Sequence, residues 1–200
     1  MTWTMVSDHL MLVVMAVACT IVVGVPAGIC AYQFPKVRTP ILRVVEVLQT
    51  IPALALLGII MVFMGAGKPT VVIGLLLYSL LPVVLNTYVG LSEVDPVLKE
   101  VATGMGMTKR NRLLRVELPL AFPLIFTGIR IAMVTAISVA VFAASVGGGG
   151  LGRIINQGIR TSDMDMIMSG TVALMGMAIL FDGGMTLVER RLKQQFTKRP

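Results

Sequence analysis

The chain has 200 residues, of which 56% are hydrophobic and 14% are charged, and its mean hydropathy is +0.89. Soluble domains carry about a quarter charged residues, so this composition excludes an ordinary soluble domain. The net charge of +7 does not indicate a nucleic-acid partner, because the basic residues are divided among short segments between apolar runs. We therefore expect an integral membrane protein.

Five apolar runs are long enough to cross a bilayer as helices, for which about 20 residues suffice at a rise of 1.5 Å each. We predict one all-α transmembrane domain over residues 1–200, without internal repeats. Pro52 falls inside the second run, and we expect it to bend that span. The expected spans are Leu10–Tyr32, Val44–Ala66, Thr70–Leu91, Leu118–Val146 and Met166–Val188.

Loop charges predict the orientation, because Lys and Arg accumulate on the cytoplasmic side of membrane proteins. With the N-terminus outside, thirteen Lys and Arg residues fall inside and three fall outside. The sequence therefore predicts an outer N-terminus and an inner C-terminus. The inner residues are Lys36, Arg38, Arg43, Lys99, Lys109, Arg110, Arg112, Arg115, Arg190, Arg191, Lys193, Lys198 and Arg199, and the outer ones are Lys68, Arg153 and Arg160.

Several polar residues lie within the expected spans. Gln49, Thr50 and Pro52 in the second span and Asn86 in the third either pack between helices or line a translocation path. Arg130 and Asp182 both fall roughly 10 Å into the membrane from the cytoplasmic side at the helical rise. Because charges within membranes tend to face the protein interior and pair, we expect an ion pair, the alternative being that Arg130 extends to the surface.

The segment at about residues 95–117 is basic and interrupted by glycine, and the topology places it in the cytoplasm between the third and fourth spans. Pro96 and the preceding Asp95 predict the start of a helix that continues to Thr103. Gly104 and Gly106 predict its end. Thr108 can cap a second amphipathic segment over Lys109–Leu118, which either lies on the membrane or inserts into the groove of a partner protein.

The spacing of this segment resembles the EAA loop of the permease subunits of bacterial ABC importers. Glu100-Val101-Ala102 is followed after three residues by Gly106, and nine residues later by Val116, one further residue and Leu118-Pro119. Val101 and Val116 depart conservatively from Ala and Ile. The resemblance implies a cytoplasmic coupling helix that docks on an ATPase, with Glu100, Ala102, Gly106, Leu118 and Pro119 as its motif residues.

The stretches QTIPALALLG (49–58), GIRIA (128–132) and GGGGLG (147–152) resemble the osmoprotectant branch of these permeases. That branch imports glycine betaine, choline or carnitine by alternating access. The similar methionine-importer permeases share the five-span fold and remain the alternative, and a channel or freestanding carrier is the alternative from another class. The resemblance implies two cytoplasmic ATPase subunits, a second identical or related permease, an extracytoplasmic substrate-binding protein and a bacterial cytoplasmic membrane.

No arrangement of residues indicates an enzyme or a cofactor site in this chain. His9 is the single histidine, expected at the outer membrane interface, and GGGGLG lacks the lysine of a phosphate-binding loop. Cys19 and Cys30 lie eleven residues apart in one span and therefore face different directions. We expect neither a metal nor a disulfide, with ATP and magnesium held by the partner ATPase.

Overall fold

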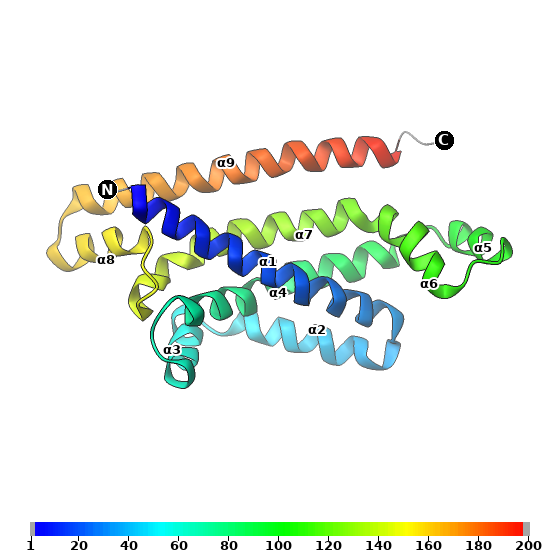
Figure 1. Cartoon of the computed structure of the whole chain (residues 1–200), viewed down its shortest axis with the longest axis horizontal. Coiled ribbons are helices and arrows are strands. Elements are labelled where there is room, and N and C mark those ends of the chain that lie inside the picture. The colour runs from blue at the N-terminus through cyan, green and yellow to red at the C-terminus, as the bar shows by residue number, and fades with distance from the viewer. Residues whose placement is uncertain (1–2, 198–200) are drawn as a thin grey trace.

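The computed structural model describes residues 3–197, and every element in that range is helical (Figure 1). Lys198 and Arg199, counted above among the inner basic residues, lie outside the described residues, as does the side chain of Lys193. The elements are α1 (Trp3–Gln33), α2 (Pro35–Thr50), α3 (Ala53–Met64), α4 (Lys68–Ser92), α5 (Pro96–Gly104), α6 (Lys109–Arg112), the π-helix η1 (Leu113–Glu117), α7 (Leu118–Val139), the 3₁₀-helix η2 (Ala140–Val146), α8 (Gly152–Thr161) and α9 (Met164–Thr197).

Four continuous helical stretches in the described part of the chain are long and apolar enough to cross a membrane. They are Trp3–Gln33, Lys68–Ser92, Lys109–Val146 and Met164–Leu192. A fifth span is reached when α2 and α3 are counted together, although their axes meet at 102°. The all-helical class is thus confirmed, and the expected bend at Pro52 in the second span, Val44–Ala66, is a sharp break between two helices.

The right-angle break between α2 and α3 follows from Pro52. A proline disfavours the helical conformation in the residue before it, and Ile51 accordingly has extended backbone angles, φ −71° and ψ 127°. Pro52 then stands at the N-cap position of α3. The proline therefore separates two helices instead of bending one.

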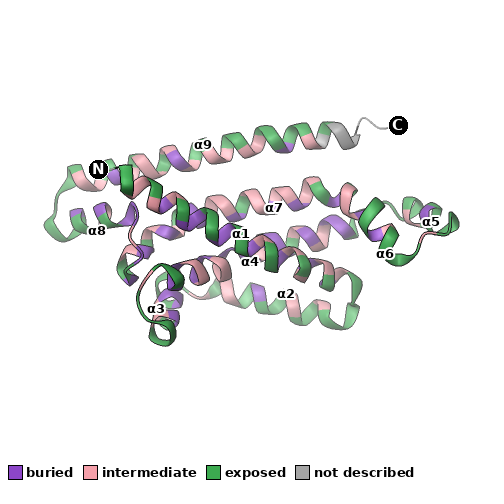
Figure 2. Ribbon diagram, in the orientation of Figure 1, coloured by how far each residue is buried: buried purple, intermediate pink, exposed green. Residues whose placement is uncertain are grey.

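Helix α4 lies at the centre of the molecule and packs against α1, α2, α3 and α7. The contact with α7 is close at Gly128, where a side chain would run into the Pro82 carbonyl and the Asn86 side chain of α4. Small residues allow membrane helices to approach closely in this way. Figure 2 shows α4 largely buried and α9 largely exposed along its length.

The residues Lys109–Val146 form one long helical stretch with two changes of geometry. The expected start of the fourth span, Leu118, is the first residue of α7, and α6 leads into α7 through η1 without a break. Pro119 has no N–H, so the carbonyl of Arg115 lacks its α-helical donor. One residue earlier, the amide of Leu118 bonds to the carbonyl of Leu113, five residues back, which is the bond of a π-helix. The turn before the proline is therefore widened rather than broken.

Candidate functional site

The loop between α4 and α7, residues 95–117, begins with the expected cap. The Asp95 side chain accepts a hydrogen bond from the Val97 amide at 2.8 Å, and Pro96 occupies the first turn of α5. The Thr108 hydroxyl likewise accepts a bond from the Asn111 amide at 3.3 Å. Both predicted helix starts of the loop are confirmed.

Gly106 ends α5 with a specific backbone motif. The Met107 amide bonds to the Ala102 carbonyl at 3.1 Å, and the Gly106 amide bonds to the Thr103 carbonyl at 2.9 Å. This pair of bonds defines a Schellman motif, whose C′ residue is left-handed, and Gly106 has φ +80°. A side chain at Gly106 would meet open space, so its backbone conformation, not crowding within this chain, requires glycine.

Helix α5 exposes an apolar row on one face. Val97, Val101 and Met105 are spaced four residues apart and are 60%, 54% and 73% exposed. Glu100 on the same helix is exposed, whereas Ala102 is buried on the opposite side. A short helix with an exposed apolar row beside a carboxylate is typical of a protein-docking element.

The last motif residues, Leu118 and Pro119, are half-buried at the start of α7. Directly before them, as the last residue of the loop, is Glu117, a spacer position to which the motif assigns no role. Its side chain is 1% exposed and accepts a hydrogen bond from Arg112 Nε at 2.6 Å. The separation of five residues does not predict that Arg112 and Glu117 pair, because side chains that meet on an α-helix are three or four residues apart.

The four polar residues considered for a translocation path do not gather in one place. Gln49, Thr50 and Pro52 lie at the α2–α3 break, where Pro52 and Thr50 are exposed and the Thr50 hydroxyl bonds to its own helix at Val47. Asn86 lies against Gly128 of α7, and its amide donates to the Pro82 carbonyl at 2.7 Å. The geometry of Asn86 accords with a packing role, and a path-lining role for the break remains a prediction.

Arg130 and Asp182 lie together on α7 and α9. Arg130 Nη1 donates to Asp182 Oδ1 at 2.8 Å and to the Thr186 hydroxyl at 3.1 Å. Arg130 Nε also lies 3.0 Å from Glu189 Oε2, and the Thr127 hydroxyl donates to the other oxygen of Glu189. The pair is therefore part of a cluster of one cation and two carboxylates that joins α7 to α9.

The sequence does not predict the burial of two polar side chains, Glu189 in the Arg130 cluster and His9 at the opposite end of the bundle. Glu189 lies one residue beyond the expected fifth span, yet its side chain is 8% exposed. Its spacing of two helical turns from Asp182 is the signal in the sequence that places both carboxylates on one face of α9. His9, expected at the outer membrane interface, does not face outward from the helices. Its side chain is fully buried, with Nε2 3.1 Å from the Ile137 carbonyl, because α7 and the glycine loop cover that side of α1.

Among the residues that the structure describes, no three His, Cys, Asp or Glu side chains group into a metal site. Cys19 and Cys30 are both free. The site therefore consists of a docking loop and polar connections between helices.

Comparison with known protein families identifies the family of this chain. The family described as "binding-protein-dependent transport system inner membrane component" matches residues 10–194. The chain belongs to this family. It is accordingly a transport component of an inner membrane, and its several apolar helices make it a multi-pass protein.

Similar relatives carry osmoprotectant names. A carnitine transport permease of Listeria monocytogenes, OpuCD, is 40% identical over 96% of this chain and 86% of the relative. A choline transport system permease of Bacillus subtilis, OpuBD, is 41% identical over 96% and 85%. The glycine betaine/carnitine/choline permease OpuCD of the same species is 40% identical over 92% and 81%. The predicted osmoprotectant resemblance is confirmed.

A solved structure shares the fold. An inward-facing structure of the MetNI methionine ABC transporter superposes with a TM-score of 0.84, covering 96% of this chain and 99% of the other. The identity of 21% means that this likeness concerns the fold alone. The predicted fold of an ABC-importer permease is confirmed.

Proposed function

We propose that this chain is the permease subunit of an ATP-driven importer that carries glycine betaine, choline or carnitine into the cell. The observation that carries the proposal is identity of about 40% over nearly the whole chain to permeases named for those substrates. Methionine is the weaker alternative, because it rests on a structural likeness at 21% identity. Family membership speaks against a channel or freestanding carrier.

Transport of this kind needs partners that hydrolyse ATP and deliver substrate. We infer that two cytoplasmic ATPase subunits bind ATP and magnesium and receive the exposed apolar row of α5 with Glu100. Closure of the ATPases around ATP would then move the loop and convert the permease between inward- and outward-facing states. The chain itself is not an enzyme in this proposal.

A second permease, identical or related, completes the translocation path. The exposed apolar faces of α3 and α9 support this, since residues such as Phe63 (85% exposed) and Leu180 (75% exposed) must be covered by a partner or by lipid. The Arg130 cluster would lie within the membrane, the α2–α3 break would line the path, and residues 1–200 would form one domain. The charge asymmetry of the loops supports an outer N-terminus and an inner C-terminus.

Substrate affinity would reside mainly in an extracytoplasmic binding protein. A quaternary ammonium group cannot donate hydrogen bonds, so tight binding requires several aromatic faces around it. Among the described residues, the one ring pair is Phe122 and Phe126, tilted with centroids 6.4 Å apart, which does not form a cage. The permease would therefore offer a weak and transient site.

The test is uptake by the importer reconstituted in proteoliposomes with its ATPase and binding protein. We expect ATP-dependent uptake of radiolabelled glycine betaine, choline or carnitine, and loss of uptake when the binding protein is omitted. Unlabelled quaternary ammonium compounds should compete, and excess methionine should not. If methionine competes and quaternary ammonium compounds do not, the protein is a methionine-importer permease instead.

A further inference from the structure

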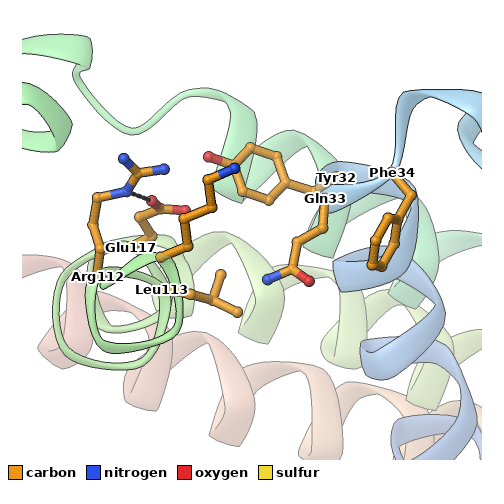
Figure 3. Close-up of a pocket in the computed structure, with 7 residues that line it drawn as sticks. Tyr32, Gln33, Phe34, Arg112, Leu113 and Glu117 are labelled. Atoms are coloured by element: carbon orange, nitrogen blue, oxygen red, sulfur yellow. Dashed lines mark hydrogen bonds and ion pairs between the residues drawn. The ribbon is translucent and has the colours of Figure 1, made fainter. Parts of the chain in front are cut away.

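One residue of α1 is held by both halves of the coupling loop. Tyr32 lies one residue before the end of α1, and its ring faces Lys99 of α5, whose Nζ is 5.3 Å from the ring centroid. Its hydroxyl is directed toward the carboxylate of Glu117 in η1 (Figure 3), and the two residues line one pocket. Figure 3 shows the Tyr32 side chain extending from α1 toward the Arg112–Glu117 pair.

The same residues are connected to one another within the loop. Arg112 Nε donates to Glu117 at 2.6 Å, and Arg112 Nη1 donates to the Thr103 hydroxyl at 3.0 Å. That hydroxyl donates to the Lys99 carbonyl at 2.7 Å. Lys99, Thr103, Arg112 and Glu117 thus form a chain of polar contacts, and Tyr32 joins it through its ring contact with Lys99 and faces Glu117. These five residues are here called the latch.

Burial makes the latch costly to disrupt. The Glu117 side chain is 1% exposed and that of Arg112 26%, and removing one partner from a buried ion pair leaves an uncompensated charge. The π-turn brings Glu117 into this position, since η1 widens the helix at residues 113–117. Such widened turns occur frequently at functional sites.

The position of Tyr32 connects the latch to α2. Phe34 is the N-cap of α2, and its amide still bonds to the Cys30 carbonyl of α1. Arg38 in the first turns of α2 returns to α1, donating to the Ala31 carbonyl at 3.4 Å. Tyr32 therefore lies in the junction of α1 and α2, where the end of one helix is bonded to the start of the other. This junction, residues 30–38, is here called the elbow, and α2 leads from it to the break at Pro52.

We propose that the latch transmits movement of the coupling loop to the α1–α2 elbow, with Glu117 and Tyr32 as its positioning residues. This rests on the proposed function, because it assumes that a partner ATPase moves the loop. It adds a second route for that movement beside the direct continuation of η1 into α7. A cavity of about 470 Å³ between the elbow and the α6–η1 segment, lined by Gln33, Phe34, Lys109 and latch residues, leaves room for the two parts to shift.

The experiment measures coupling in the reconstituted complex of permease, ATPase and binding protein. Glu117→Gln removes the charge with little change of shape, and Tyr32→Phe removes only the hydroxyl. In each variant we expect uptake per ATP hydrolysed to fall about tenfold, the effect of losing one buried charge-assisted hydrogen bond. ATP hydrolysis should continue but lose its stimulation by the binding protein.

Matched controls separate the latch from general damage. Glu46→Gln alters an exposed carboxylate whose partner, Arg43, is one turn away on α2, and Tyr78→Phe removes a half-buried tyrosine hydroxyl on α4. Both controls should retain wild-type coupling. Because Tyr32 acts through Glu117, the double variant Tyr32→Phe/Glu117→Gln should be no worse than Glu117→Gln alone.

The outcomes are decisive for the latch. Wild-type coupling in both single variants overturns the proposal, as does a strictly multiplicative loss in the double variant. If the Glu117→Gln variant does not assemble, the Tyr32→Phe variant decides, because it preserves the Arg112–Glu117 ion pair. The quantity measured is again uptake per ATP hydrolysed. Absence of osmoprotectant uptake by the wild-type complex would count against the proposed function only, since binding-protein stimulation of ATP hydrolysis still tests the latch.

Discussion

The long helical stretch Lys109–Val146 departs from α-helical geometry at both ends, and in opposite ways. At the Lys109 end it widens into the π-turn η1, and at the Val146 end it tightens into the 3₁₀-helix η2. The first end is connected to its surroundings by long polar side chains. The second is connected by backbone bonds and small residues.

The Val146 end is closely packed on its buried side, although two open pockets lie beside it around Ala144 and Arg153. Ala140 and Ala143 are fully buried, the Gly148 amide bonds to the Ala143 carbonyl at 2.7 Å, and the Gly67 amide bonds to the Val146 carbonyl at 2.9 Å. The turn that follows contains left-handed residues at Gly147, Gly149 and Gly150, as expected for a tight turn. Close packing fixes one arrangement, because a shift would force atoms together.

The Lys109 end can change its contacts without such clashes. Arg112, Lys99 and Tyr32 make hydrogen bonds and a ring contact through flexible side chains, beside a cavity. The half-buried Lys99 and Tyr32 can exchange their contacts for contacts with water or a partner while the Arg112–Glu117 pair stays intact. The difference indicates a rigid end and an adjustable end on one helix, and the following predictions test it.

The largest effect is expected from Gly152→Ala at the rigid end. The new methyl group would run into the backbone of Val141, and overpacking against backbone cannot be relieved by a rotamer change. We expect a loss of about 3 kcal/mol of stability, measured as a lower midpoint of thermal unfolding of the detergent-solubilised protein. Gly176→Ala in α9, where the methyl group meets nothing within 4 Å, is the control and should not lower the midpoint.

A smaller effect on stability, but a strong one on transport, is expected from Gly106→Val at the adjustable end. A β-branched residue resists φ +80°, at a cost of about 1–3 kcal/mol, so the Schellman motif should open. Insertion and the unfolding midpoint of the helix bundle should change little, whereas uptake should fall about tenfold, the equivalent of 1.4 kcal/mol. Gly106→Asn, which tolerates the left-handed conformation, should retain most of the uptake, and near-normal uptake by the valine variant would remove Gly106 from the coupling mechanism.

The smallest perturbation tests which end faces the cytoplasm. Single cysteines at Ser162, beyond the rigid end, and at Arg110, at the adjustable end, are both at exposed positions and should leave transport nearly unchanged in a background without Cys19 and Cys30. A membrane-impermeant thiol reagent applied to intact cells should label the first and not the second. The reverse pattern would invert the proposed topology and separate the adjustable end from the ATPase.

Much of the backbone follows from local sequence. The helix starts at Asp95 and Thr108, the end of α5 at Gly106 and the interruption at Pro52 depend on residues whose backbone preferences act over one turn. The angle of the break in the second span does not follow from the sequence, because a proline specifies an interruption but not its angle. The continuity of η1 with α7 does not follow from the sequence, because a proline such as Pro119 can end a helix or be tolerated where a wider turn satisfies the backbone.

The sequence by itself determined the class of protein, the all-helical fold, the loop motif and the family resemblance, because these depend on composition and on fixed spacings along the chain. Only the tertiary structure decided the partners of the buried polar groups. Glu117 meets Tyr32, Glu189 meets Arg130 and His9 meets the Ile137 carbonyl across separations of 59 to 128 residues. Such pairings depend on how the helices pack, since a buried charge or ring nitrogen takes the partner that a neighbouring helix brings within reach.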